Sequence, residues 1–291
     1  MSTDHAVHMP VRTAVQPATK KYLPIFAGID GTGDPDDTEY ARAFSGSHVK
    51  TLSGLPWTGG CFYRRGPTQL GIQTEGIAEQ VAIDVALAWR RVLGRGAFPR
   101  VFLAGFSRGG AAAILACRLL RKEGINVAYL ALFDAVDRTV GMEASTIAAN
   151  VQVCQHAARH PDAKSRPEFG SCGTRCEDQA ATRFAFRNDF MCTHGGVGGT
   201  PWTRSNPRLQ MSDEGYIIEP RSARKAAALA VGGSIGAALT IFGVPVRPAA
   251  IADSVSTIAS TRVTPEMDAQ GAELVERWIK PRFLSAMLHQ P

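Results

Sequence analysis

The sequence predicts an α/β fold in which a mostly parallel sheet is flanked by helices. Predominantly apolar runs occupy residues 23–29, 101–106 and 125–133, and such runs are typical of strands buried on both faces of a parallel sheet. Segments with helical periodicity separate these runs, over residues 74–95 and 108–123. Because strands and helices alternate, the connections are long enough to join parallel strands.

The first predicted strand, residues 23–29, ends in the acidic, turn-rich loop DGTGDPDD. The first long helix has an expected cap at Thr74 and an expected end at Gly94 or Gly96. One face of this helix is predicted to be buried because its apolar residues recur at helical spacing. This face comprises Ile77, Val81, Val85, Ala88 and Trp89.

The alternation continues after the second strand. An alanine- and leucine-rich helix is expected from residue 108 to Gly124, followed by the strand 125–133. The stretch VQVCQHAARH, residues 151–160, is interpreted as a helix. The stretch RFAFRNDF, residues 183–190, is interpreted as a strand.

A last amphipathic helix is expected near the C-terminus, capped by Thr264 and opened by Pro265. We expect this helix to pack on the body of the protein. Its apolar side is predicted to carry Met267, Leu274, Val275, Trp278 and Ile279.

Composition indicates one main domain with appendages. The chain has 291 residues, of which 45% are hydrophobic and 20% charged, so it can bury a substantial core. The formal charge of +6 is spread along the chain, which argues against a nucleic-acid partner but is compatible with an anionic membrane surface. We expect a flexible tail over 1–20 without a secretory signal, a catalytic domain over 21–220 and a helical region over 221–291.

Four of the six cysteines lie between residues 154 and 192. A four-thiolate zinc site needs two close pairs, and the close pair here is Cys172 with Cys176. No metal or other cofactor is therefore predicted. Disulfide bonds formed in an oxidising compartment and free buried thiols both remain open.

Ser107 lies in the sequence GFSRG between a buried strand and an apolar helix. In an α/β-hydrolase the nucleophile occupies such a strand-to-helix turn, where glycines two residues before and after it relieve crowding. The helix that follows also favours developing negative charge at its N-terminus. Ser107 is therefore the candidate nucleophile, and the alternative is a small residue in a tight turn.

The candidate acid and base follow Ser107 in the chain order of this fold. Asp134 stands directly after the strand 125–133, at the edge where active-site groups of parallel sheets gather, and Asp137 is the reserve. His194 is the candidate base because it lies in a glycine-rich loop after a predicted strand. His156 and His160 are interpreted as packing or surface residues.

The oxyanion of the reaction needs two backbone N–H donors. The N–H of Arg108, next to the nucleophile, is the first candidate. The second is expected from the loop of Gly31 and Thr32 after the first strand.

Several motifs carry a family resemblance over residues 22–200. They are IDGTGD, CFYRRGP, LAGFSRGGAAA, LALFDAVDRTVG, CQHAARH, RPEF and THGGVGG. In this order they resemble the motifs of the type VI secretion phospholipase effectors, within a wider group of bacterial and fungal α/β-hydrolases. The chain departs from the pattern at Ala135, where the family often has Thr, and at Gly196, where Asp is common.

The resemblance implies that Ser107 is the nucleophile, Asp134 the acid and His194 the base of a phospholipase. It further implies an antibacterial toxin made in the bacterial cytoplasm, secreted without a classical signal peptide and acting at the membrane or periplasm of a target cell. Its partners would be membrane phospholipids, an immunity protein and a component of the secretion apparatus. Two alternatives stay open: a soluble esterase for small esters, and a membrane-active or partner-binding protein on a hydrolase-like scaffold.

Residues 226–246 form an uncharged stretch long enough to cross a bilayer. Basic residues flank it, namely Arg221, Arg224, Lys225 and Arg247. It is interpreted as an apolar helical lid over the active site or a buried helix pair, with membrane docking as the alternative. Its glycines and Pro245 weaken it as a lone helix.

Overall fold

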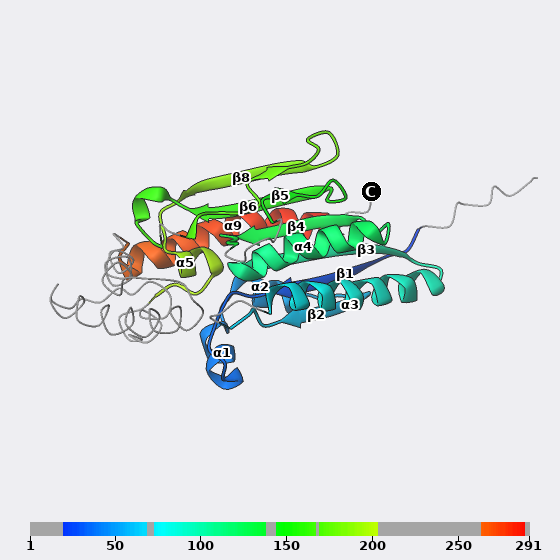
Figure 1. The fold of residues 1–291 in the computed structure, drawn as a ribbon, viewed down its shortest axis with the longest axis horizontal. Coiled ribbons are helices and arrows are strands. Elements are labelled where there is room, and N and C mark those ends of the chain that lie inside the picture. Colours follow the sequence, from blue (N-terminus) through cyan, green and yellow to red (C-terminus); the bar gives the residue numbers. More distant parts are fainter. Residues whose placement is uncertain (1–19, 69–72, 138–143, 167–168, 203–262, 289–291) are drawn as a thin grey trace, which may run out of the picture.

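The main sheet has six strands in the order β2-β1-β3-β4-β6-β8, and every neighbouring pair in it is parallel. The computed structural model describes residues 20–68, 73–137, 144–166, 169–202 and 263–288. The strands are β1 (Tyr22–Ile29), β2 (Gly60–Arg64), β3 (Phe98–Phe106), β4 (Val127–Phe133), β6 (Val153–Arg159) and β8 (Arg183–Phe190). This arrangement confirms the predicted α/β fold with a mostly parallel sheet (Figure 1). A separate parallel pair joins β5 (Thr146–Ile147) to β7 (Arg175–Cys176).

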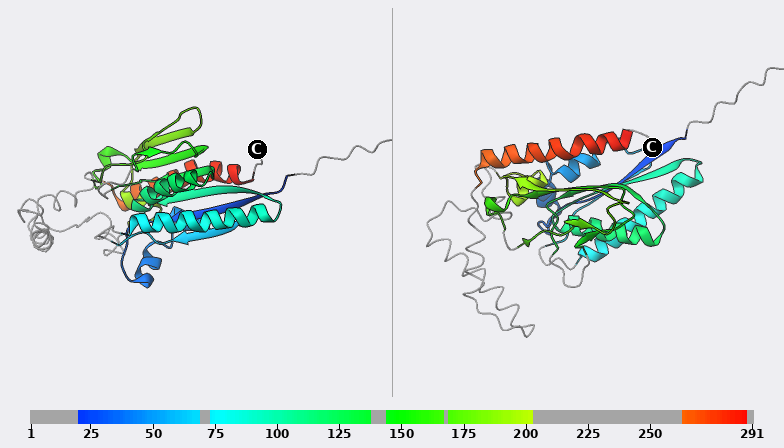
Figure 2. Two further views of the ribbon diagram at one scale, coloured as in Figure 1. Left: turned by 45° about the vertical axis from the view of Figure 1, so that its right-hand side comes forward. Right: turned by 90° about the horizontal axis from the view of Figure 1, so that it is seen from above.

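Helices cover both faces of the sheet, as the two views in Figure 2 show. Residues of β1 alternate between the faces: Ile25 and Ile29 belong to one apolar cluster and Phe26 to the other. The helices α3 (Thr74–Gly94) and α4 (Arg108–Lys122) pack on the first face. The helices α2 (His48–Ser53) and α9 (Pro265–Leu288) pack on the second. Short helices follow the ends of three strands, namely α1 (Asp37–Ala43), the 3₁₀ helix η1 (Pro161–Ala163) and α5 (His194–Gly198).

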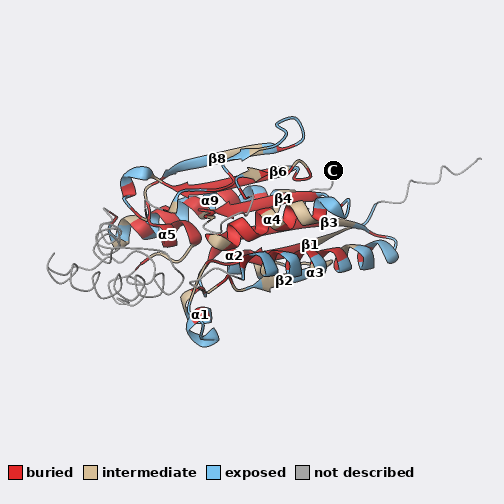
Figure 3. Ribbon diagram, in the orientation of Figure 1, coloured by how far each residue is buried: buried red, intermediate tan, exposed pale blue. Residues whose placement is uncertain are grey.

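Both long helices of the first face are rich in buried alanine. The small side chains of Ala111, Ala112 and Ala113 let α4 approach β3 and α3 closely. Figure 3 shows the result, with red buried residues along the inner sides of α3 and α4 and pale blue exposed residues on the outer side of α3. The sheet edge from which α4 starts is therefore held by a dense core.

The prediction of a helix over residues 151–160 is wrong, because this stretch contains strand β6. β6 lies between β4 and β8, and residues 154–159 are all buried. A strand that is buried on both faces lacks the alternation of polar and apolar residues that marks a half-buried strand. The two alanines of this stretch also suit a helix in isolation.

Two details of the predicted helices need correction. Thr74 is the first residue of α3 and is buried, while Gln73 holds the cap position without a side-chain hydrogen bond. Leu274 was predicted on the apolar side of α9 but is 47% exposed. The buried side of α9 comprises Asp268, Gly271, Ala272, Val275, Ile279 and Phe283. This buried side includes Asp268, a charged residue. A search for apolar residues at helical spacing therefore misplaced the buried side of the helix.

The predicted start, cap and packing of α9 are confirmed, except that Met267 is only partly buried. The helix begins at Pro265, and the N–H of Met267 donates to the hydroxyl of Thr264 at 3.3 Å. Val275 and Ile279 pack on the sheet, with Trp278 partly buried beside them. The C-terminal helix therefore belongs to the same core as the sheet.

Several expectations concern residues outside the described ones. They are residues 1–19 of the predicted tail over 1–20, the stretch 226–246 and its flanking basic residues. Among the described helices, none combines the length and hydropathy needed to span a bilayer. The six cysteines all lie in the described part, and all are free thiols. No group of three or more His, Cys, Asp or Glu side chains in that part could hold a metal ion.

Candidate active site

Ser107 occupies a sharp turn between β3 and α4. Its φ of 55° is positive, which is rare for a residue with a side chain, and its side chain is almost fully buried. The flanking glycines are sterically required. A Cβ at Gly105 would lie 2.5 Å from the carbonyl oxygen of Gly109, and a Cβ at Gly109 would lie 2.2 Å from that of Asp30. The turn therefore has the geometry expected of the predicted nucleophile elbow, and the role of Ser107 as nucleophile stays a prediction.

His194 connects Ser107 to Asp134. Its Nε2 lies 2.8 Å from the Oγ of Ser107, and its Nδ1 lies 2.7 Å from the Oδ2 of Asp134. A carboxylate accepts the Nδ1–H proton, so Nε2 is left to accept the serine proton. All three side chains are buried, although they come from loops far apart in the sequence. The structure thus brings the three predicted residues together in the order that a catalytic triad requires.

Asp134 directly follows β4 and also has a positive φ, of 44°. Burial by itself raises the pKa of its carboxyl group, but the nearby charge of Arg159 and the hydrogen bond from His194 lower the pKa to about 2. The carboxylate therefore stays ionised and can stabilise a positive charge on the imidazole. Asp134, the first choice from the sequence, accepts the hydrogen bond from His194, and the reserve Asp137 lies further along the same loop.

Arg159 is a site residue that the sequence analysis missed. Its guanidinium is buried at the end of β6 and donates to the Oδ2 of Asp134. It also donates to the carbonyl oxygens of Ser165 at 2.7 Å and Arg166 at 2.8 Å. The motif CQHAARH contains this arginine, but reading the stretch as a helix hid its place at the end of a strand beside β4.

A second missed residue, Asp268, holds the loop of His194. From α9 its carboxylate accepts from the N–H of Thr193 at 2.6 Å and from the hydroxyl of Thr193 at 2.9 Å. It also accepts from the N–H of Trp202 at 2.9 Å. A Cβ at Gly196 would lie 2.0 Å from Oδ1 of Asp268, so a residue with a side chain does not fit there.

The loop after β1 lies against Ser107. A Cβ at Gly31 would be only 3.1 Å from the Cβ of Ser107, and the hydroxyl of Thr32 is buried with no hydrogen-bond partner among the described residues. Arg108 opens α4, where backbone N–H groups lack partners within the helix. These positions suit the predicted oxyanion donors, whose role remains a prediction.

A buried polar cluster supports that loop. Asp30 accepts hydrogen bonds from the hydroxyls of Ser47 at 2.6 Å and Tyr63 at 2.7 Å. The hydroxyl of Tyr40 donates to the carbonyl oxygen of Gly31 at 2.8 Å. Because burial outweighs the two hydroxyl hydrogen bonds, the pKa of Asp30 rises to about 7.

His156 is a packing residue, as the sequence indicates. Its Nε2 accepts from the N–H of Ala135 at 3.1 Å, and its Nδ1 donates to the carbonyl oxygen of Gly173 at 3.1 Å. Burial lowers its pKa to about 4, so the ring is neutral at physiological pH. It therefore steadies the backbone next to Asp134 without entering the triad.

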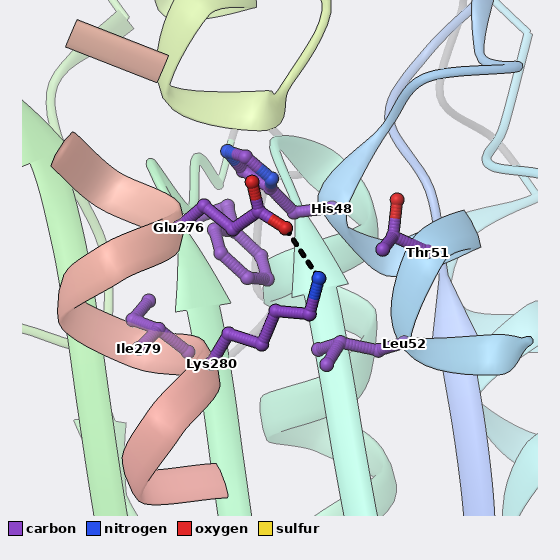
Figure 4. A pocket seen from close by; sticks show the side chains of 7 residues that line it. His48, Thr51, Leu52, Glu276, Ile279 and Lys280 are labelled. Atoms are coloured by element: carbon purple, nitrogen blue, oxygen red, sulfur yellow. Dashed lines mark hydrogen bonds and ion pairs between the residues drawn. The ribbon is translucent and has the colours of Figure 1, made fainter. Parts of the chain in front are cut away.

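Figure 4 shows a small hollow between α2 and α9. Phe133 also lines this hollow. His48 faces Glu276 and Lys280 there, and the two charged residues form an ion pair at 2.6 Å. Its volume of about 10 Å³ is no larger than one water molecule needs. The hollow is therefore not a site for an organic substrate.

Comparisons with known proteins find similar folds at low sequence identity. The sequence matches no family model and no curated protein. Lipase B of Aspergillus fumigatus is 13% identical over 98% of this chain and 66% of that chain, with a TM-score of 0.37. RedJ, a thioesterase of the prodiginine biosynthetic pathway in Streptomyces coelicolor, is 16% identical over 68% of this chain and 94% of that chain, with a TM-score of 0.28. A cutinase-like protein from Cryptococcus sp. is 13% identical over 57% of this chain and 83% of that chain, with a TM-score of 0.25.

The chain has an α/β-hydrolase-like fold. The topology of the chain shows this fold, because its sheet is parallel and Ser107 lies at the turn from β3 into α4. The geometry of Ser107, His194 and Asp134 determines what chemistry this fold can perform.

Proposed function

We propose that this protein is a serine hydrolase that cleaves carboxylic ester bonds. The observation that carries the proposal is the buried chain of hydrogen bonds from Ser107 through His194 to the ionised Asp134. In a ground state of this kind the serine hydroxyl already points its proton at a base.

The reaction follows from these contacts. Nε2 of His194 takes the proton of the Ser107 hydroxyl while Oγ attacks the ester carbonyl carbon. Backbone N–H groups of Arg108 and of the Gly31–Thr32 loop stabilise the resulting oxyanion. The imidazolium then gives its proton to the departing alcohol, which leaves an acyl group on Ser107. A water molecule activated by His194 releases the acid and restores the enzyme.

Labelling with a fluorophosphonate probe tests this proposal. The intact protein should be labelled at Ser107, and Ser107→Ala should lose both labelling and ester hydrolysis by several orders of magnitude. Ser45→Ala is a matched control because Ser45 is exposed. Normal turnover of Ser107→Ala on short soluble esters would show that Ser107 is not the nucleophile.

We further propose membrane phospholipids as the substrates and a role as an antibacterial type VI secretion effector. The ordered motifs described above support this step, and so does the net charge of +6, which favours anionic lipid surfaces. The same resemblance supports an immunity protein in the producing cell and a partner in the secretion apparatus. A panel of defined phospholipids with product analysis is the test. Hydrolysis of short esters without any phospholipid product would leave a soluble esterase instead.

A further inference from the structure

The outer side of α3 carries two large apolar side chains that face solvent. Ile83 is 53% exposed and Leu87 is 52% exposed, one helical turn apart. They border a hollow of about 380 Å³ between α3 and α4, whose wall includes Ala82, Ala86 and Leu119. The hollow is large enough to receive a branched apolar side chain.

Charged groups surround this apolar centre in a balanced set. Glu79 and Arg90 of α3 and Lys122 and Glu123 of α4 line the hollow. Arg90 forms an ion pair with Glu123 at 2.6 Å, and both side chains remain about half exposed. Within the residues that the structure describes, Glu79 has no ion-pair partner.

The exposed stripe of α3 is nearly symmetric about the position of the buried Val85. Ile83 and Leu87 lie two residues before and after Val85, and Glu79 lies six residues before it where Arg90 lies five after it. In an antiparallel pair of such helices, Ile83 meets Leu87 of the other copy and Glu79 meets Arg90 of the other copy. Two-fold symmetry forms each of these contacts twice.

We propose that the stripe Glu79–Arg90 of α3 is the interface of an antiparallel homodimer. The partner is a second copy of this chain, because the stripe complements itself in both charge and hydrophobicity. Apolar side chains of one copy enter the hollow of the other, and Glu79 shares Arg90 of the other copy with the Glu123 to which that arginine is paired.

The orientation keeps the catalytic edges apart. α3 starts after β2, at the same edge of the sheet at which Ser107 stands, and runs away from that edge. In the antiparallel pair the two catalytic edges therefore point in opposite directions. Association leaves both active sites open, and hydrolysis of a short soluble ester should not depend on it.

Sedimentation velocity on the full chain from about 1 to 100 µM tests the proposal. We expect a monomer–dimer equilibrium in which Leu87→Asp raises the dissociation constant at least about tenfold, since it puts a carboxylate in each apolar contact. Leu274→Asp on α9 is the matched control, because Leu274 is an exposed leucine outside the stripe. A monomer at every concentration, or an equal effect of both substitutions, would overturn the proposal.

A charge exchange tests the antiparallel register. Glu79→Arg should weaken association several-fold because it faces Arg90 of the other copy, and adding Arg90→Glu should restore it. Circular dichroism and thermal unfolding establish that each surface variant is folded. Failure of the double variant to recover association, with the fold intact, would contradict this register.

Discussion

At the scale of single residues, the active site concentrates backbone strain. Ser107 and Asp134 have φ values of 55° and 44°, and each directly follows one of two neighbouring parallel strands. Such conformations cost about 1–3 kcal/mol for residues with a side chain. The surrounding structure tolerates this cost where the two side chains must converge on His194.

The backbone strain at Ser107 predicts that glycine at this position gives a more stable protein than alanine does. Ser107→Gly should raise the melting temperature by about 2–4 °C relative to Ser107→Ala, since glycine adopts the turn without strain. Both variants lose the hydrogen bond to His194, so their difference isolates the backbone. Differential scanning calorimetry measures it, and equal melting temperatures would mean that the turn is unstrained.

The guanidinium of Arg159 predicts a second effect on the triad. Arg159→Met removes the cation beside the buried carboxylate, so the pKa of Asp134 should rise from about 2. We expect kcat to fall about 10- to 100-fold with little change in KM, and the acidic limb of the pH–rate profile to move to higher pH. Arg159→Lys keeps the charge and should retain the wild-type limb. A profile unchanged in Arg159→Met would assign this arginine a purely structural role.

The carboxyl group of Asp30 predicts an unusual pH dependence of stability. Its pKa is raised from 3.8 to about 7 in the folded state, so the folded protein holds a proton that the unfolded chain has lost. The contribution of Asp30 to the free energy of unfolding is therefore largest below pH 4. It decreases by about 1.4 kcal/mol per pH unit as the pH rises towards 7.

Asp30→Asn removes this decline while its amide oxygen can still accept from Ser47 and Tyr63. The stability of the variant relative to wild type should therefore increase between pH 4 and 7 and stay constant above pH 7.5. Urea unfolding at a series of pH values measures it. A constant difference over the whole series would show that Asp30 is ionised throughout.

At the scale of helices and strands, the sequence alone predicts an element correctly where hydrophobic periodicity and turn residues indicate the same structure. The elbow between β3 and α4 and the strand before Asp134 were predictable because an apolar run, a glycine pair and a helical repeat occur in succession. The site residues Arg159 and Asp268 were not predictable. Arg159 lies on a strand buried on both faces, and Asp268 interrupts the apolar stripe of a helix that acts on a loop far away in sequence.

The contact between α5 and α9 predicts a steric limit at Gly196. Gly196→Ala places a methyl group where the carboxylate of Asp268 now lies, and should destabilise the protein by about 1–3 kcal/mol while displacing the loop of His194. Gly76→Ala is the matched control because a Cβ there meets nothing within 4 Å. It should be neutral or stabilising by up to about 1 kcal/mol. Thermal unfolding and ester hydrolysis measured together would show whether both losses occur in Gly196→Ala alone.

At the scale of the whole molecule, the parallel sheet assembles the site. Asp30, Ser107, Asp134, Arg159 and His194 stand at or after the carboxyl ends of β1, β3, β4, β6 and β8. Because these ends share one edge of a parallel sheet, five distant segments meet there without any long-range signal in the sequence. Two other buried histidines, His48 and His156, pack with neutral rings inside the same domain.

These two histidines predict how the whole protein responds to acid. Burial lowers the pKa of both His48 and His156 from 6.5 to about 4. The charge of Lys280 adds to the lowering at His48, whereas Glu276 at His48 and Asp134 at His156 oppose it in part. Below pH 6.5 these two imidazoles bind protons in the unfolded chain but not in the folded protein. Stability from each ring is therefore complete above pH 6.5 and declines by about 1.4 kcal/mol per pH unit as pH falls towards 4.

His156→Gln should remove one of these two slopes, because glutamine can accept from Ala135 and donate to Gly173 without titrating. His48→Gln should remove the other, and the double variant should lose both. The two rings have different aromatic neighbours, Phe133 for His48 and Phe186 for His156, so their effects should add. Urea unfolding between pH 4 and 8 measures the slopes. Above pH 7.5 all four proteins should show parallel curves, which controls for packing losses caused by the substitutions. A wild-type slope retained in His156→Gln would mean that the His156 ring is already protonated in the folded protein, and the hydrogen bond from Ala135 would then need another acceptor.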